Sequence, residues 1–136
     1  IKAVNIDEAD RFGGNSVSIS GNTLAVGVEY EDSNQTTITN GASASSNNSN
    51  SASGAVYVYK RTGSTWAQEA YIKAANNDSK DEFGSFVSLG KDMLAVGAIK
   101  ESSNQTTITN GTSASSNNSN SIIGQCAEFY LSITNQ

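Results

Sequence analysis

The stretch RFGGNSVSISGNTLAVGV at residues 11–28 decides the fold, and it returns at residues 82–98 as EFGSFVSLGKDMLAVGA. In the first copy Val17 and Ile19 alternate with serines, and a Ser-Gly-Asn turn leads into a second apolar run. Apolar residues at every second position indicate a strand, and a Gly-Asn turn between two such runs is typical of a β-hairpin. We therefore predict strands at residues 16–20 and 23–28.

Two further strands complete the repeat. Residues 55–61 are rich in Val and Tyr, and a Thr-Gly-Ser turn separates them from a fourth run at residues 65–74. No segment has apolar residues at helical spacing, so we expect no long helix. Four short antiparallel strands per repeat are typical of a propeller blade. The predicted fold class is all-β, with four-stranded antiparallel propeller-like blades, about two in number.

The repeat also sets the expected domain organisation. The second copy follows the first at an offset of 71 residues up to Phe83-Gly84, and of 70 residues from Val87 onward. Residues 1–11 are expected to be the tail of a preceding blade and a linker, because Ile1-Lys2-Ala3 returns as Ile72-Lys73-Ala74. Residues 12–74 form the first blade, residues 75–82 a linker, and residues 83–136 a second, incomplete blade.

Two blades cannot close a ring, since propellers have about 4–8 blades. The remaining sheet edges and the uncovered blade face would then be exposed. We expect either a homo-oligomer that completes the ring or a chain that is part of a larger propeller.

Long polar tracts interrupt both copies at residues 33–51 and 103–121. They differ only at Ala42, which becomes Thr112. Recent exchange between the repeats at the DNA level explains this identity, and so does a shared binding demand on both loops. Tracts this poor in apolar residues cannot order themselves by burial. We expect flexible spacers, with hydrogen-bonding surfaces for sugars or proteins as the alternative.

Composition excludes several functions. The chain has 8 basic and 13 acidic residues and a net charge of −5, so it lacks the basic footprint of a nucleic-acid binder. No run of 18 apolar residues exists that could span a membrane. Histidine is absent, which rules out a Ser-His-Asp or Cys-His mechanism from this chain alone. The single cysteine, Cys126, is expected to be a partly buried strand residue.

Three ordered motifs resemble a known family. Asp10-Arg11-Phe12-Gly13, then residues 24–28 (LAVGV), then residues 54–59 (GAVYVY) are similar to the FG-GAP repeat of integrin-α-type propellers. The nearest form is the long one of bacterial multi-repeat surface proteins, and the likeness extends to about Gly124. It implies an extracellular or cell-surface protein, bacterial in origin, that serves binding or adhesion without catalysis. The protein or glycan ligand stays open.

The chain departs from the family where calcium is concerned. Many members carry an Asp-rich calcium loop between the first two strands, but here that connection is only residues 20–22 or 90–92. Calcium takes 6–8 oxygen ligands, which so short a turn with at most one carboxylate cannot supply. We therefore do not transfer that site, and we expect no cofactor and no catalytic residue.

Acidic residues before each Phe-Gly pair are the remaining candidates for a cation site. They are Asp7 and Asp10 in the first copy and Asp78 and Asp81 in the second, with calcium as the cation. The alternative is that these aspartates shape turns by binding backbone amides. A second acidic patch of Glu29, Glu31 and Asp32 is expected to be a solvated loop edge.

The C-terminal stretch breaks the repeat. Gly54 is followed by Ala-Val-Tyr-Val-Tyr, whereas Gly124 is followed by Gln-Cys-Ala-Glu-Phe, and a frameshift just before Ile122 is one explanation. Ordinary divergence at the end of an array is the other. Ala127, Phe129, Leu131 and Ile133 still alternate with polar residues or tyrosine, so a strand remains the expectation.

Three functional hypotheses follow from these patterns. The first is a non-catalytic extracellular binding or adhesion module built from FG-GAP-like blades. The second is a structural repeat module that assembles with copies of itself. The third is a non-catalytic scaffold within a larger surface enzyme.

Overall fold

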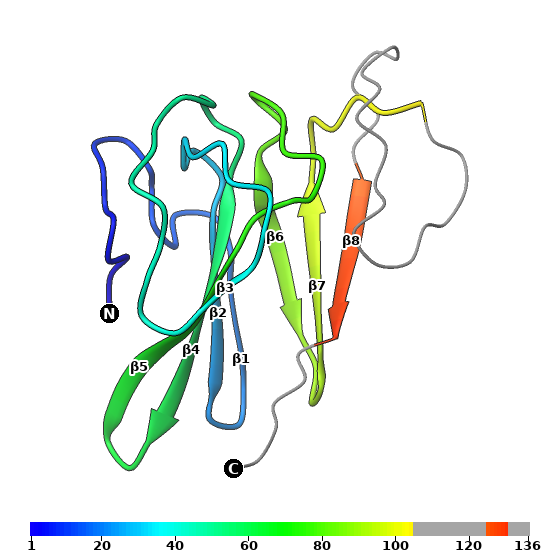
Figure 1. The fold of residues 1–136 in the computed structure, drawn as a ribbon. Coiled ribbons are helices and arrows are strands. Elements are labelled where there is room, and N and C mark those ends of the chain that lie inside the picture. Colours follow the sequence, from blue (N-terminus) through cyan, green and yellow to red (C-terminus); the bar gives the residue numbers. More distant parts are fainter. Residues whose placement is uncertain (105–124, 131–136) are drawn as a thin grey trace.

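The computed structural model describes residues 1–104, together with the backbone of residues 125–130, and in these ranges the chain is all-β (Figure 1). Its strands are β1 (Val17–Ser20), β2 (Thr23–Val28), β3 (Thr39–Asn40), β4 (Ala55–Thr62), β5 (Thr65–Ile72), β6 (Phe83–Leu89), β7 (Met93–Ala98) and β8 (Gln125–Tyr130). None of the described residues forms a helix that could cross a membrane.

The first sheet contains the predicted blade. Its strand order is β1-β2-β4-β5-β3, and β1, β2, β4 and β5 form an antiparallel meander that we call blade 1. The four strands predicted from the sequence are confirmed, with shifts of one or two residues at their ends. The predicted hairpin turn is also present, since Ser20 pairs with Thr23 around Gly21-Asn22.

The second sheet, blade 2, consists of β6, β7 and β8 and lies beside blade 1 (Figure 1). Val96 lies opposite Ala127 in it, just as Val26 lies opposite Tyr57 in blade 1. The altered C-terminal stretch therefore pairs in the same register as the sequence that it replaces, and the expected strand is confirmed at residues 125–130. The expected positions Leu131 and Ile133 lie outside the described residues. The two blades do not close a ring within the described chain.

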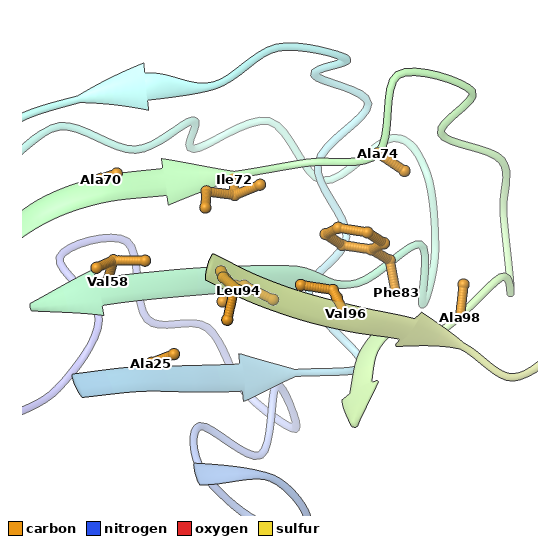
Figure 2. Packing of buried hydrophobic residues seen from close by; sticks show 10 residues of the cluster. Ala25, Val58, Ala70, Ile72, Ala74, Phe83, Leu94, Val96 and Ala98 are labelled. Atoms are coloured by element: carbon orange, nitrogen blue, oxygen red, sulfur yellow. The ribbon is translucent and has the colours of Figure 1, made fainter. Parts of the chain in front are cut away.

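The main core lies between the two blades (Figure 2). Each blade contributes one face, and we call the face of blade 1 that looks toward blade 2 its trailing face. That face carries Ala25, Val56, Val58, Ala70 and Ile72. The face of blade 2 that packs on it is the leading face, with Val87, Leu89, Leu94, Val96 and Ala98. Phe83 fills the space between them.

A second core covers the leading face of blade 1. Tyr57, Tyr59 and Tyr71 are buried there beneath Phe12 and Ala3 of the N-terminal segment. Phe12 meets the Tyr57 and Tyr59 rings edge to face, with centroids 5.6 and 6.2 Å apart. Residues 1–3 form no strand, so the expected end of a fourth strand is not seen there.

The polar loop at residues 33–51 is not a free spacer, and that expectation is wrong for the first copy. Thr39 and Asn40 form the short strand β3, which pairs with Tyr71 and Ala70 at the edge of β5. The Gly41 amide continues this pairing by donating to the Glu69 carbonyl at 2.6 Å.

Asparagine side chains from both linkers also hold this loop. Asn77 Nδ2 donates to the carbonyl oxygens of Ser33 and Gln35, at 2.8 and 2.7 Å, and Asn5 Nδ2 donates to the Ser45 carbonyl at 2.6 Å. Long-range hydrogen bonds thus order a tract that has little apolar surface to bury. The matching loop of the second copy lies outside the described residues from position 105 onward.

Candidate functional site

The seam between the blades depends on the Phe-Gly pair of the second repeat. Phe83 is buried, and its backbone forms a parallel bridge to Gly54, with the Phe83 amide donating to the Ser53 carbonyl at 2.9 Å. A Cβ atom at Gly27 would lie 2.0 Å from the Gly84 carbonyl oxygen. Glycine is therefore required at position 27, because two backbones meet there without room for a side chain.

The Phe-Gly pair also needs a left-handed backbone. Gly84 has a φ of +91°, and a Cβ atom there would lie 2.4 Å from the Ala55 carbonyl oxygen. Glycine adopts this conformation without the steric cost that other residues incur. The same residue thus turns the chain and lets blade 2 approach blade 1.

Two serines of blade 1 complete the seam with hydrogen bonds. The Val87 amide donates to Ser16 Oγ at 2.6 Å, and the Leu89 amide donates to Ser18 Oγ at 3.0 Å. These bonds tie the edge of β6 to β1, two strands that are 71 residues apart in sequence. The seam therefore combines apolar packing with hydrogen bonds that fix the position of β6 relative to β1.

The leading face of blade 1 lacks such a cover at its β1 edge. Val17 and Ile19 are the counterparts of Val87 and Leu89, yet their exposed fractions are 56% and 61%. Ile1, Val4 and Ile6 of the N-terminal segment are exposed as well. We call Val17 and Ile19 the open edge, because the residues that match them in blade 2 pack against a neighbouring blade.

The family comparison agrees with this geometry. Residues 66–116 match the family model of the FG-GAP repeat, a span that begins within β5 and holds the Phe83-Gly84 pair and β7. The chain contains an FG-GAP repeat. No curated protein and no solved structure matches the chain.

The acidic residues before each Phe-Gly pair form turns. The Asp10 carboxylate accepts from the Asp7 amide at 3.1 Å, and the Asp81 carboxylate accepts from the Asp78 amide at 3.1 Å. Asp7 is exposed and accepts from Asn48 Nδ2 at 2.9 Å. Each pair of candidate cation ligands thus lies close together, but its carboxylate caps the backbone of its own turn.

These buried aspartates have raised pKa values. Burial raises the pKa of Asp10 to about 6 and that of Asp81 to about 7. The negative charges of Glu31 and Glu101, respectively, add to the effect. Among the residues that the structure describes, no group of three or more His, Cys, Asp or Glu side chains could hold a metal ion.

A buried polar network centres on Glu31. Its carboxylate accepts from Lys73 Nζ at 2.7 Å and from the Tyr71 hydroxyl at 2.7 Å, with Asn5 Nδ2 at 3.3 Å. Lys73 Nζ also donates to Ser53 Oγ at 2.8 Å. Burial lowers the pKa of Lys73, while the negative charge of Glu31 opposes that shift. The network joins β5, the polar loop and the N-terminal segment.

The prediction of a solvated edge at residues 29–32 is wrong for two of its members. Glu29 and Glu31 are both buried, Glu29 with a hydrogen bond from Asn15 and Glu31 with the lysine. A buried carboxylate is tolerated because it is paired and hydrogen-bonded. The sequence feature that indicates a buried acidic partner is Lys73, a charged residue at the end of the apolar strand that carries Tyr71 and Ile72.

This network is buried and connects separate segments of the chain. The Lys73 and Glu31 side chains have exposed fractions of 0% and 2%, and each meets several hydrogen-bonding partners of its own chain. Among the described residues, the open edge is an exposed apolar surface that could contact another molecule.

Proposed function

We propose that the chain is a non-catalytic binding and adhesion module of a bacterial cell surface, in which FG-GAP blades stack side by side. The open edge of blade 1 is the observation that supports this proposal. In blade 2 the matching apolar residues are covered by a neighbouring blade, so the leading face of an FG-GAP blade is a surface for packing against another one.

The architecture supports stacking through backbone as well as side chains. Gly27 and Gly84 allow close approach, and Ser16 and Ser18 accept hydrogen bonds from the next blade. Such features recur once per repeat in arrays where each unit contacts only its neighbours. Loops at the ends of the strands would then be presented to other proteins or to glycans.

A three-blade chain tests this proposal. A second copy of residues 12–82 is inserted before Phe12, and Val17→Cys is introduced only in the original copy, in a Cys126→Ser background. We expect a thiol reagent to modify the introduced cysteine rapidly in the two-blade chain and far more slowly in the three-blade chain. The reason is that the added blade covers the open edge.

Ile38→Cys is the matched control, because Ile38 is exposed on the polar loop, away from the seam. Its rate of modification should be the same in both chains. Equal reactivity of the Val17→Cys thiol in the two chains would refute stacking on the open edge.

A further inference from the structure

A buried lysine and an asparagine side chain meet at the two oxygens of one carboxylate. Lys73 Nζ donates to Glu31 Oε2 at 2.7 Å, and Asn5 Nδ2 donates to Glu31 Oε1 at 3.3 Å. The three residues come from the N-terminal segment, the segment after β2 and the position that follows β5. An amine, an amide carbon and a carboxylate that can move protons between them are thus gathered in one place.

The lysine is placed as a nucleophile. Its side chain is fully buried, and its second partner is Ser53 Oγ at 2.8 Å. Burial lowers the pKa of Lys73 and so favours the neutral amine, although the negative charge of Glu31 opposes that shift. A lysine that is kept from water beside a proton acceptor is activated for attack on a carbonyl carbon.

The Asn5 side chain is held as the electrophile. Its Oδ1 accepts from the Tyr57 hydroxyl at 2.5 Å, and its Nδ2 also donates to the Ser45 carbonyl at 2.6 Å. The Tyr57 hydroxyl would stabilise the negative charge that develops on Oδ1 during attack. Well-oriented intramolecular reactions reach effective concentrations of about 10⁵–10⁸ M, which compensates for the low reactivity of an amide.

We propose that Lys73 and Asn5 form an isopeptide bond, with Glu31 carrying protons between them. Glu31 first takes a proton from the Lys73 ammonium, and the neutral amine attacks Asn5 Cγ, whose carbonyl electron pair moves to Oδ1. Glu31 gives its proton to Nδ2 and takes a second one from Nζ. The electron pair on Oδ1 restores the carbonyl, the Cγ–Nδ2 bond breaks, and ammonia leaves with the second proton as ammonium. No oxidant or other reactant is required.

The second repeat has the same asparagine–glutamate contact without a described lysine. Asn76 Nδ2 donates to Glu101 Oε2 at 2.6 Å, and these two residues are the counterparts of Asn5 and Glu31. Within residues 1–104, the acidic partners of the two lysine ion pairs are Glu31 and Glu82, not Glu101. Asn76 therefore provides a matched control for Asn5.

The bond would fix the N-terminal segment on blade 1. It closes the chain between residues 5 and 73, and that loop includes Ala3's neighbour segment and Phe12, which cover the tyrosines of the leading face. A covalent cross-link of this kind stabilises a protein mainly by restricting its unfolded state. The bond does not depend on blade stacking, because all of its groups belong to blade 1, its loops and the N-terminal segment.

Mass spectrometry of the folded original chain tests this inference. We expect an intact mass that is lower than the sequence mass by one ammonia molecule. Trypsin should release residues 3–11 joined to residues 62–80, because cleavage after Lys73 is blocked. Tandem mass spectrometry of this species locates the bond. Succinimide formation at Asn40-Gly41 would also release ammonia, but it would leave these two peptides separate.

Three variants assign the roles of the residues, and circular dichroism checks that each is folded. Asn5→Asp keeps an electrophilic carbon, so its bond should form with the loss of water instead of ammonia. Glu31→Gln lacks the proton carrier and should keep its full mass, whereas Asn76→Ala should form the bond like the original chain.

Two results would contradict the proposal. An original chain that keeps its full mass after days in the folded state, and that yields residues 3–11 as a separate peptide, would overturn the bond itself. A bond that forms equally fast in Glu31→Gln would overturn the role of Glu31. Protection of the Val17→Cys thiol in the three-blade chain would leave blade stacking intact in either case.

Discussion

Val87 and Leu89 of blade 2 are partly buried, whereas their counterparts Val17 and Ile19 in blade 1 are exposed. The four residues occupy matching positions on matching strands, but the faces that carry the two pairs meet different neighbours. Blade 2 packs on the trailing face of blade 1, and within the described chain no blade occupies the corresponding place before blade 1. The exposure of the β1 or β6 edge of a leading face therefore reports whether another blade covers that edge.

The N-terminal segment covers the other part of that face. Phe12 packs on Tyr57 and Tyr59, and the Tyr59 hydroxyl donates to the Lys2 carbonyl at 3.1 Å. Large aromatic side chains thus cover part of the blade 1 face against which no second sheet packs. The two Phe-Gly pairs should therefore contribute different amounts to the free energy of unfolding. Substitutions in each pair can measure the difference.

The largest difference is expected between the two phenylalanines. Phe83→Ala should lower the free energy of unfolding by about 3–5 kcal/mol, because it leaves a cavity in the core between the blades. Phe12→Ala should cost only about 1 kcal/mol, since Phe12 is half-buried. Chemical denaturation of both variants measures the two losses. Equal losses would mean that the N-terminal segment stabilises blade 1 as strongly as a packed blade does.

The close backbone approach at the seam gives the next effect. Gly27→Ala should destabilise the chain by about 1–3 kcal/mol, because the new methyl group collides with the Gly84 carbonyl and the blades must separate. Gly90→Ala is the control, since its nearest contact would be 3.5 Å away, and it should change stability by less than about 0.5 kcal/mol. Thermal unfolding followed by circular dichroism distinguishes the two. A Gly27→Ala variant as stable as the control would contradict a tight seam.

The sequence predicted the strands well, because alternation and turn residues are local signals. The hairpin at Gly21-Asn22 and the blade made of β1, β2, β4 and β5 follow from such signals alone. Exposure of Val17 is different, since its period-two pattern shows a strand face but not what lies against it. Whether Val17 is covered depends on which blade packs beside it.

The polar features were harder to predict for a related reason. Glu31 and Lys73 are 42 residues apart, and Asn77 reaches the loop carbonyl of Ser33 across 44 residues. Such contacts have no periodic signature in the sequence. The turn-capping role of Asp10 and Asp81 was foreseen as an alternative because it involves a residue only three positions away.

The two buried aspartates should give the chain an unusual dependence on pH. Their folded pKa values, about 6 for Asp10 and about 7 for Asp81, exceed the ordinary value of 3.8. The folded state therefore holds more protons between pH 4 and 7, so stability falls as the pH rises through this window. Asp81→Asn should raise the melting temperature at pH 8 and flatten its decline from pH 4 to 7.

Asp10→Asn should act over the narrower window from pH 4 to 6, and Asp7→Asn, at an exposed position, serves as the control. Melting temperatures measured from pH 4 to 8 compare all three variants. A decline with pH that persists unchanged in Asp81→Asn would mean that other groups cause it.

The smallest expected effect concerns a pair of positions that the two repeats occupy with different residues. In blade 1 the Arg11 guanidinium lies over the Tyr30 ring, 4.7 Å from its centroid, whereas in blade 2 Glu82 forms an ion pair with Lys100. Arg11 and Glu82 are counterparts with φ values of 56° and 55°, so the same left-handed backbone carries either side chain. Glu82→Arg should lower the melting temperature slightly, because it places two positive charges together.

Adding Lys100→Tyr to Glu82→Arg should restore that loss, since it rebuilds the cation–π pair of blade 1 in blade 2. The single variant's deficit should shrink at high salt, which screens the repulsion, while the double variant should change little. Melting temperatures at low and high salt decide the matter. A double variant as unstable as the single one would show that the two positions do not act as an exchangeable pair, and that the surroundings of each blade determine which pair it accepts.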